Sequence, residues 1–354
     1  MKGYALRSVD DETITEMEFP EEELTGDQVR VRITHSGVCH SDVHIREGGF
    51  ELGDGEFYSN EAGGAEYPLI MGHEIVGVVE STGPDATIKE GEQVVVYAWL
   101  GCGECPTCET GQENRCPNMK RALGVQRNGG YAEKVFLPHD KYLVPLDGVD
   151  PEWAATIGCS GITAYSAAKQ TKLKSKDAPV LVIGAGGVGL MCVASLKALG
   201  YTNISVIDRS DANFERALEL GATRTLVSTA ETTPQDIWKF VGEQPHAVAD
   251  FVNNEETGSL AFASLATGGT MVQVGLFGGR FKVQTAVLAF QQIDIQGSYV
   301  GSLTELREVM ELAREGKFPR IPITTREMSL ESVVESLDAL KEGRSRGRVV
   351  LTNA

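Results

Sequence analysis

Four cysteines lie close together in the sequence and could bind one metal ion. Cys102, Cys105, Cys108 and Cys116 follow the spacing C-x2-C-x2-C-x7-C. Four thiolates in one short segment are typical of a closed structural zinc site, which contributes folding energy and has no open position for chemistry. An iron–sulfur cluster also uses four thiolates, but no second electron-transfer motif accompanies this one. We therefore predict a structural zinc site.

Further metal-type side chains are spread over three segments. Residues 39–44, with the sequence CHSDVH, place a soft thiol ligand beside groups that can relay protons. Residues 72–74 read GHE, and Cys159 follows in a third segment. Taken singly, Cys159 could be a small buried apolar residue and His73 a structural histidine in a turn. The residues alone leave open whether the three segments form one site.

A glycine-rich turn, GAGGVG at residues 184–189, follows an apolar run and precedes a helical pattern. In such a turn the first glycine permits the tight bend, the second lets the backbone approach a pyrophosphate, and the third allows close packing of helix and strand. The amide groups at the start of the helix would hold the diphosphate. The predicted dinucleotide site therefore contains Gly184, Gly186, Gly187, Val188 and Gly189.

Asp208 ends the next expected strand, 19 residues beyond Gly189. A carboxylate at this place accepts hydrogen bonds from the ribose hydroxyls and repels a 2′-phosphate, which favours NAD over NADP. Arg209 could stack on adenine, tolerate a 2′-phosphate or be solvated. We favour solvation, and predict NAD as the cofactor.

The elements that would position these residues differ along the chain. From about residue 179 strands and helices alternate, which is typical of βαβ units and a parallel sheet. Strands are expected at residues 180–183, 204–208, 224–227, 247–252, 270–275 and 293–299, and a last helix at 303–316. The first 150 residues instead hold short β-type runs, at residues 29–33, 75–80, 93–97 and 131–137. They predict a β-barrel-like domain, which a final strand at 348–351 is expected to rejoin.

The composition is typical of a globular protein, and 354 residues suffice for two or three domains. The formal charge of −18 argues against nucleic acid and anionic membranes as partners, because both bind basic patches. The longest uncharged apolar stretch, residues 178–196, is interpreted as strand, turn and helix rather than as a membrane span. Residues 1–10 lack the apolar core of a secretory signal. We therefore expect a cytoplasmic protein, whose seven cysteines need an explanation other than disulfides.

The segment GHE-x2-G-x5-G at residues 72–83 resembles the zinc signature of medium-chain alcohol dehydrogenases. The resemblance covers essentially the whole chain and is closest to tetrameric bacterial and archaeal NAD-dependent alcohol dehydrogenases. It implies an α/β protein with two parts. Residues 1–157 and 302–354 would form a GroES-like β-barrel catalytic domain. Residues 158–301 would form a Rossmann coenzyme domain with a doubly wound parallel sheet.

The same resemblance implies two zinc ions per chain. Cys39, His73 and Cys159 would hold the catalytic zinc, and the four clustered cysteines the structural one. Glu74 would sit just behind the catalytic metal, as a neighbouring group or a transient ligand. Asp42 would orient the His73 ring through its other nitrogen, as metal-binding histidines usually require.

The resemblance also implies roles in proton transfer and in binding. Ser41 would accept the alcohol proton and pass it through the nicotinamide ribose to His44. Further cofactor contacts would come from His40, Arg348, Thr163, Val274, Ser298 and Val300. Trp99 and Phe50 would line the substrate pocket.

The implied activity is reversible hydride transfer between a primary or secondary alcohol and NAD, giving an aldehyde or ketone. Zinc would act as a Lewis acid on the alcohol hydroxyl. The alternatives are a polyol or sugar-alcohol dehydrogenase of the same superfamily, and a non-catalytic zinc- and nucleotide-binding protein. Trp99 and Leu100 argue weakly against a polar pocket. Family members pair through the strand near residues 293–300, so a homotetramer built as a dimer of dimers is expected.

Residues 46–68 form a long segment with several acidic residues, glycines and four aromatic residues. It could be a solvated surface loop, or its aromatic side chains could form a rim or lid over the substrate channel. The sequence leaves both readings open.

Overall fold

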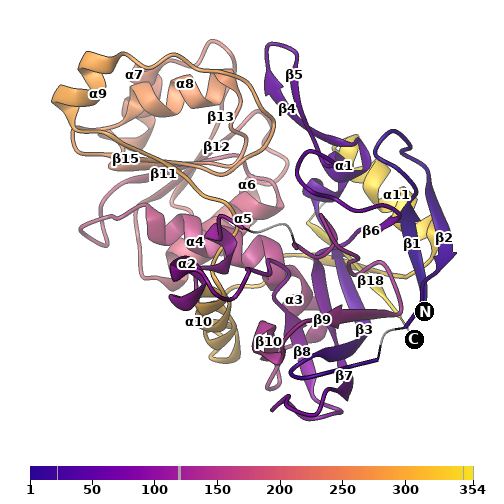
Figure 1. The fold of residues 1–354 in the computed structure, drawn as a ribbon. Helices are drawn as coiled ribbons and strands as arrows, with labels where there is room; N and C mark the ends of the chain where they lie inside the picture. Colours follow the sequence, from indigo (N-terminus) through magenta and orange to yellow (C-terminus); the bar gives the residue numbers. More distant parts are fainter. Residues whose placement is uncertain (22, 119–120, 346, 354) are drawn as a thin grey trace.

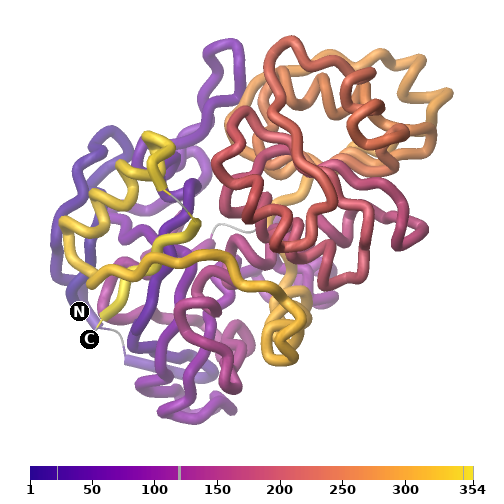
Figure 2. Tube along the Cα trace, turned by 180° about the vertical axis from the view of Figure 1, so that it is seen from behind, coloured from indigo at the N-terminus to yellow at the C-terminus, as the bar shows by residue number. Residues whose placement is uncertain are grey.

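The computed structural model describes residues 1–21, 23–118, 121–345 and 347–353. The structure has two halves. One is built around a parallel sheet and the other around a mainly antiparallel sheet (Figure 1). The two chain ends lie close together on the antiparallel half, at the edge away from the parallel sheet (Figures 1 and 2).

The parallel sheet has six strands in the order β13-β12-β11-β14-β15-β16. Their bounds are β11 Val180–Ile183, β12 Ile204–Asp208, β13 Arg224–Val227, β14 Ala247–Asp250, β15 Thr270–Gln273 and β16 Asp294–Gly297. The accompanying helices are α5 Gly187–Ala198, α6 Phe214–Leu220, α7 Pro234–Val241, α8 Glu255–Ser264 and α9 Thr285–Gln291. All residues of β11 and β14 are buried, as expected for central parallel strands covered on both faces. This is the strand order of a doubly wound dinucleotide-binding sheet, and the predicted alternation is confirmed.

The other half contains a seven-stranded sheet in the order β10-β8-β7-β3-β18-β17, with β9 paired to β3. The bounds are β3 Val29–Val38, β7 Glu74–Thr82, β8 Gln93–Val96, β9 Lys134–Leu137, β10 Leu143–Pro145, β17 Ile323–Glu327 and β18 Arg348–Thr352. A smaller sheet joins β1 Lys2–Leu6, β2 Ile14–Glu18 and β6 Leu69–Ile70. Because β18 pairs antiparallel with β3, the expectation that the end of the chain rejoins the first part is confirmed.

The other helices lie outside the βα repeat of the parallel sheet, and some of them carry site residues. They are α1 His40–Arg46, α2 Pro106–Glu109, α3 Pro151–Thr156, α4 Ile162–Gln170, α10 Leu303–Arg314 and α11 Leu330–Lys341. Short turns of other helix types lie at η1 Glu113–Arg115, η2 Asp140–Tyr142 and η3 Ile157–Gly161, the last a π-helix. Within the described ranges, no helix combines the length and the apolar character needed to cross a membrane.

Two expectations need correction. The strand predicted at residues 131–137 begins only at Lys134, because the backbone of Tyr131 bonds to Met71 and Tyr4 instead of to β3. The long segment at residues 46–68 is not simply a loop, since it contains the antiparallel hairpin of β4 Gly49–Gly53 and β5 Glu56–Ser59. Asp54 and Gly55 connect the two strands with positive φ angles of 55° and 77°. A two-residue turn of this kind fits the twist of paired strands.

Candidate active site

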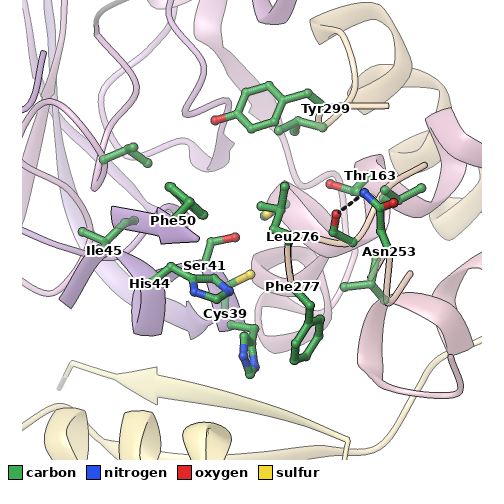
Figure 3. A pocket seen from close by; sticks show the side chains of 18 of the residues that line it. Cys39, Ser41, His44, Ile45, Phe50, Thr163, Asn253, Leu276, Phe277 and Tyr299 are labelled. Atoms are coloured by element: carbon green, nitrogen blue, oxygen red, sulfur yellow. Dashed lines mark hydrogen bonds between the residues drawn. The ribbon is translucent and has the colours of Figure 1, made fainter. Parts of the chain in front are cut away.

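Cys39, His73 and Cys159 come together at one buried point (Figure 3 labels Cys39). The two sulfur atoms and a ring nitrogen of His73 lie within 4.8 Å of one another. Cys39 immediately precedes α1, His73 immediately precedes β7, and Cys159 lies in the π-helical turn η3. Two thiolates and one imidazole are a donor set that suits zinc and leaves a fourth position open.

Asp42 holds His73 and Cys39 in position through hydrogen bonds. Its Oδ1 lies 3.0 Å from His73 Nδ1, and its Oδ2 accepts hydrogen bonds from the Cys39 amide at 3.0 Å and the Tyr131 hydroxyl at 2.8 Å. The carboxylate is completely buried, so these three partners replace water. With Nδ1 occupied, Nε2 of His73 is the nitrogen left for a metal. Sequence reasoning anticipated Asp42 but missed Tyr131.

The ligand groups are electrostatically coupled. Burial alone would lower the pKa of His73, but the charge of Asp42 and its hydrogen bond outweigh burial and raise that pKa well above 6.5. A hydrogen bond from Cys159 lowers the pKa of the Cys39 thiol well below its usual value. A metal cation would bind here by replacing the protons that the two thiols and the histidine otherwise share.

Glu74 lies behind the three ligands and is also completely buried. Arg348 Nη2 donates to both carboxylate oxygens at 2.6 Å, and the Ser160 hydroxyl donates to Oε1 at 2.7 Å. Burial raises the pKa of Glu74, whereas the Arg348 charge opposes that rise. Ser160, which follows Cys159 directly, was not singled out from the sequence.

Arg348 was predicted as a cofactor contact, and the structure shows which groups surround it. Its Nη2 is engaged with Glu74, while its Cδ and Nη1 lie beside Gly187 of the glycine-rich turn. Arg348 therefore connects the carboxylate behind the metal ligands with the start of α5.

Ser41 and His44 lie one helical turn apart on α1, on one face of the helix. Both line the pocket above Cys39 (Figure 3). His40 also lines it, with its ring centroid 5.3 Å from that of His44 and 5.4 Å from that of Phe277. Burial and the neighbouring His40 lower the pKa of His44, although Glu47 opposes the shift. His44 is therefore neutral at pH 7 and can accept a proton.

The four clustered cysteines also converge. Their sulfur atoms lie 3.5 Å apart for Cys105–Cys108, 3.8 Å for Cys105–Cys116 and 4.0 Å for Cys102–Cys108. Four thiolates at about 2.3 Å around a tetrahedral zinc would lie about 3.8 Å apart. A hydrogen bond from the backbone of Glu104, and to a lesser extent hydrogen bonds from neighbouring thiols, lower the pKa of Cys102 to about 6. Burial raises the pKa of Cys108 to about 12. The cluster fits a closed zinc site.

The glycine-rich turn has the shape that a dinucleotide requires. A side chain on Gly189 would overlap the carbonyl oxygen of Gly184, whereas a Cβ on Gly186 would meet open space. The backbone is thus closed toward the sheet and accessible on the side where a diphosphate would bind. At the end of β12, Asp208 accepts hydrogen bonds from the Ala185 amide at 2.6 Å and the Ser210 amide at 3.0 Å. Arg209 beside it is exposed.

Several of the residues predicted to bind the cofactor surround the same pocket. Thr163, Val188, Val274, Ser298 and Val300 all line it. Val300 has a φ of +55°, which is strained for a β-branched residue and is found mostly where function demands it. The Ser298 hydroxyl accepts a hydrogen bond from Gln170 at 2.9 Å, which holds this segment against α4.

The pocket itself encloses about 600 Å³. Trp99 packs against His73 with ring centroids 5.7 Å apart, so an aromatic wall adjoins the metal ligands. Phe50 from the hairpin and Leu276 from the other half face one another across the cavity (Figure 3). Its outer lining is mainly apolar, with Phe50, Leu52, Tyr58, Val125, Leu276, Phe277 and Tyr299.

Comparison with known proteins agrees with this geometry. The family described as "Alcohol dehydrogenase GroES-like domain" matches residues 25–148, and "Zinc-binding dehydrogenase" matches residues 187–315. An NAD-dependent alcohol dehydrogenase of Sulfurisphaera tokodaii is 34% identical over 328 residues, or 92% of each chain. The chain belongs to the zinc-type medium-chain alcohol dehydrogenase family. It is therefore an enzyme of the alcohol dehydrogenase type, and the expected two-part fold is confirmed.

Two further similarities place this alcohol dehydrogenase in context. The crystal structure of the alcohol dehydrogenase from Aeropyrum pernix has a TM-score of 0.88 at 25% identity, with both chains covered completely. A D-arabinose 1-dehydrogenase (NADP(+)) of Saccharolobus solfataricus is 32% identical over 351 residues, covering 96% of this chain and 94% of that one. The family thus includes relatives named for alcohols and for a sugar.

Proposed function

We propose that this alcohol dehydrogenase oxidises apolar primary or secondary alcohols with NAD at the site formed by Cys39, His73 and Cys159. The observation that carries the proposal is the position of these three metal-type ligands at the floor of a pocket with apolar outer walls. An alkyl or aryl group would lie against Trp99, Phe50 and Leu276 while its hydroxyl reaches the ligands.

Several residues of the chain would hold the metal, the substrate and the cofactor in position for hydride transfer. Zinc bound here would supply a Lewis acid that lowers the pKa of an alcohol hydroxyl. Asp42 keeps His73 oriented, and Glu74 with Arg348 supplies a compensated charge pair behind the site. Val300 and its neighbours would hold the nicotinamide with backbone groups, so that substrate and cofactor carbon atoms are brought together.

Ser41 and His44 would carry the alcohol proton away. The Ser41 hydroxyl takes the proton in the pocket, and the neutral imidazole of His44 accepts it nearer the surface. A positioned proton acceptor contributes about 100-fold or more to a rate. The lowered pKa of His44 keeps it neutral throughout the neutral pH range.

His44→Gln is therefore expected to lower kcat/KM for alcohol oxidation at pH 7 by about 100-fold. The wild-type rate should decline only as the pH falls below the ordinary histidine pKa of 6.5, because His44 then becomes protonated. The variant should lose this decline and should be partly rescued by added imidazole. His139→Gln, at an exposed histidine outside the pocket lining, is the control. An unchanged pH profile in His44→Gln would contradict the relay.

The substrate proposal is tested by NADH formation with zinc-replete protein and a panel of aliphatic, benzylic, secondary and polyhydroxylated alcohols. We expect the apolar alcohols to have the higher kcat/KM, since each buried methylene contributes about 0.8 kcal/mol to binding. Turnover restricted to polyols would contradict the proposal. So would NAD binding and zinc binding without turnover of any alcohol.

A sugar or polyol substrate is the second candidate, and the similarity to a D-arabinose dehydrogenase favours it. Such a substrate needs several hydrogen-bonding partners along its length. The pocket lining offers neutral polar side chains such as Asn60, Gln126 and Asn253, and Glu51 of the hairpin is the only acidic side chain among the described lining residues. A non-catalytic role is the least supported candidate, because a protein that uses zinc only for stability needs no open ligand position.

We also propose two zinc ions per chain, a homotetramer and a cytoplasmic location. The two thiolate-rich clusters support the first, and seven free cysteines suit a reducing compartment. Within the described residues β16 pairs only with β15 and is the edge of its sheet, and Phe290 nearby is 67% exposed, which supports pairing between chains. Sedimentation of a single-chain species would contradict the tetramer. The proposed domains remain residues 1–157 with 302–354, and residues 158–301.

A further inference from the structure

Two segments from different halves of the chain line one side each of the substrate pocket. The β4–β5 hairpin contributes Phe50, Leu52 and Tyr58 to the lining, and residues 274–279 after β15 contribute the opposite side. Both views of the chain show the hairpin extending away from the antiparallel half toward the parallel one (Figures 1 and 2).

The two segments touch at their tips. A Cβ on Gly53 would lie 2.9 Å from the Cα of Gly279, and a Cβ on Gly278 would overlap the carbonyl oxygen of Glu51. Only backbones without side chains can approach so closely. The contact therefore depends on Gly53 in the hairpin and on Gly278 in the segment after β15.

Arg280 joins the same two segments electrostatically. Its Nη1 lies 3.0 Å from Asp54 Oδ2, and its Nη2 lies 2.9 Å from Glu56 Oε1. Asp54 is in the two-residue turn of the hairpin and Glu56 is the first residue of β5. One guanidinium thus binds two carboxylates at the hairpin turn, each through a separate nitrogen.

The side chains of the hairpin explain why its position matters for the pocket. Phe50 and Tyr58 are cross-strand partners, so they move together with the strands. Phe50 also packs against His44 with ring centroids 5.2 Å apart. A hairpin that moved away from Gly278 and Gly279 would carry this aromatic wall with it and lengthen the pocket.

We propose that Arg280 is a positioning residue that sets the length of the substrate pocket. By pairing with Asp54 and Glu56 it holds the hairpin against Gly278 and Gly279, so that the pocket admits short alcohols and restricts long or bulky ones. The inference rests on the proposed oxidation of apolar alcohols. It assigns specificity to a residue that does not itself line the pocket.

The three charged groups are exposed, with 52% of Arg280, 71% of Asp54 and 65% of Glu56 accessible. Exposed ion pairs contribute little individually and are weakened by salt. We therefore expect the loss of Arg280 to change specificity moderately, by about two- to tenfold. At about 1 M salt the preference of the wild type for short alcohols should also become smaller.

The test compares Arg280→Ala with Arg326→Ala, which removes an exposed ion pair to Glu335 outside the pocket lining. Straight-chain primary alcohols of three and eight carbons are the probes. We expect Arg280→Ala to raise the ratio of kcat/KM for the long over the short alcohol about two- to tenfold, mainly through KM of the long one. Arg326→Ala should leave the ratio at the wild-type value. Charge reversal by Arg280→Glu with Asp54→Lys and Glu56→Lys should restore it.

Hydrogen exchange of the backbone amides of residues 49–59 gives a readout without substrate. We expect faster exchange in Arg280→Ala and wild-type exchange in Arg326→Ala. An unchanged ratio of kcat/KM overturns the proposal. If the wild type oxidised no alcohol, the proposed function would fail, and unchanged exchange would then show separately that Arg280 does not hold the hairpin.

Discussion

Cys39→Ala is expected to abolish alcohol oxidation while leaving the protein folded. The variant removes one of three ligands of a metal that would stabilise the transition state by several kcal/mol. Each 1.36 kcal/mol of transition-state stabilisation is a factor of ten in rate. We expect kcat/KM to fall by about 10⁴-fold. Metal analysis should show one zinc ion per chain instead of two, because the four-cysteine cluster is separate.

Cys192→Ala is the matched control for this variant. Cys192 is a completely buried free thiol on α5 and belongs to neither cysteine cluster. Its replacement should retain two zinc ions and most of the activity. If Cys39→Ala kept substantial activity with one zinc ion bound, the catalytic role of the Cys39–His73–Cys159 site would be wrong.

Asp42 shows how far the sequence could specify this site. The types and spacing in residues 39–44 allow a metal ligand and a proton relay, and the family resemblance assigns Asp42 to His73. Neither could reveal that the same carboxylate also binds the amide of Cys39 and the hydroxyl of Tyr131. Tyr131 is distant in sequence and carries no motif, so only the pairing of strands and loops brings it to Asp42.

Arg348 illustrates a second limit. The expected end strand is present, and the strand register pairs Val349, the neighbour of Arg348, with Val38 of β3. Its bond to Glu74 joins residues that are 274 positions apart. A contact of that kind depends on β7 and β18 pairing with opposite edges of β3 in one sheet, which no local pattern encodes.

The hairpin is different, because a local signal was available. Asp54-Gly55 between two short runs with aromatic residues is a strong indication of a two-residue hairpin turn. The many acidic residues and glycines of the segment suggested a loop instead. Its contact with Gly278 and Gly279 could not have been predicted, since it depends on the relative position of the two halves.

Cys105→Ser is expected to have the opposite profile to Cys39→Ala, with its main effect on stability. Zinc bound by four thiolates contributes on the order of 10 kcal/mol in small zinc domains. Here the cluster is one small part of a much larger core, so we expect a loss of only several kcal/mol of stability and a fall in Tm of about 10 °C or more. Thermal unfolding and zinc content measure both quantities, and Cys192→Ala again serves as the control.

The position of the cluster implies a second consequence for activity. Asn114, between Cys108 and Cys116, donates a hydrogen bond to the carbonyl oxygen of Tyr299 at 3.1 Å. Tyr299 precedes the strained Val300 and lines the pocket. Loss of the metal should therefore release one support of this segment and weaken NAD binding moderately, although no zinc ligand of the cluster reaches the pocket. A Cys105→Ser protein with one zinc ion, wild-type Tm and wild-type NAD affinity would show that the four-thiolate site is not structural.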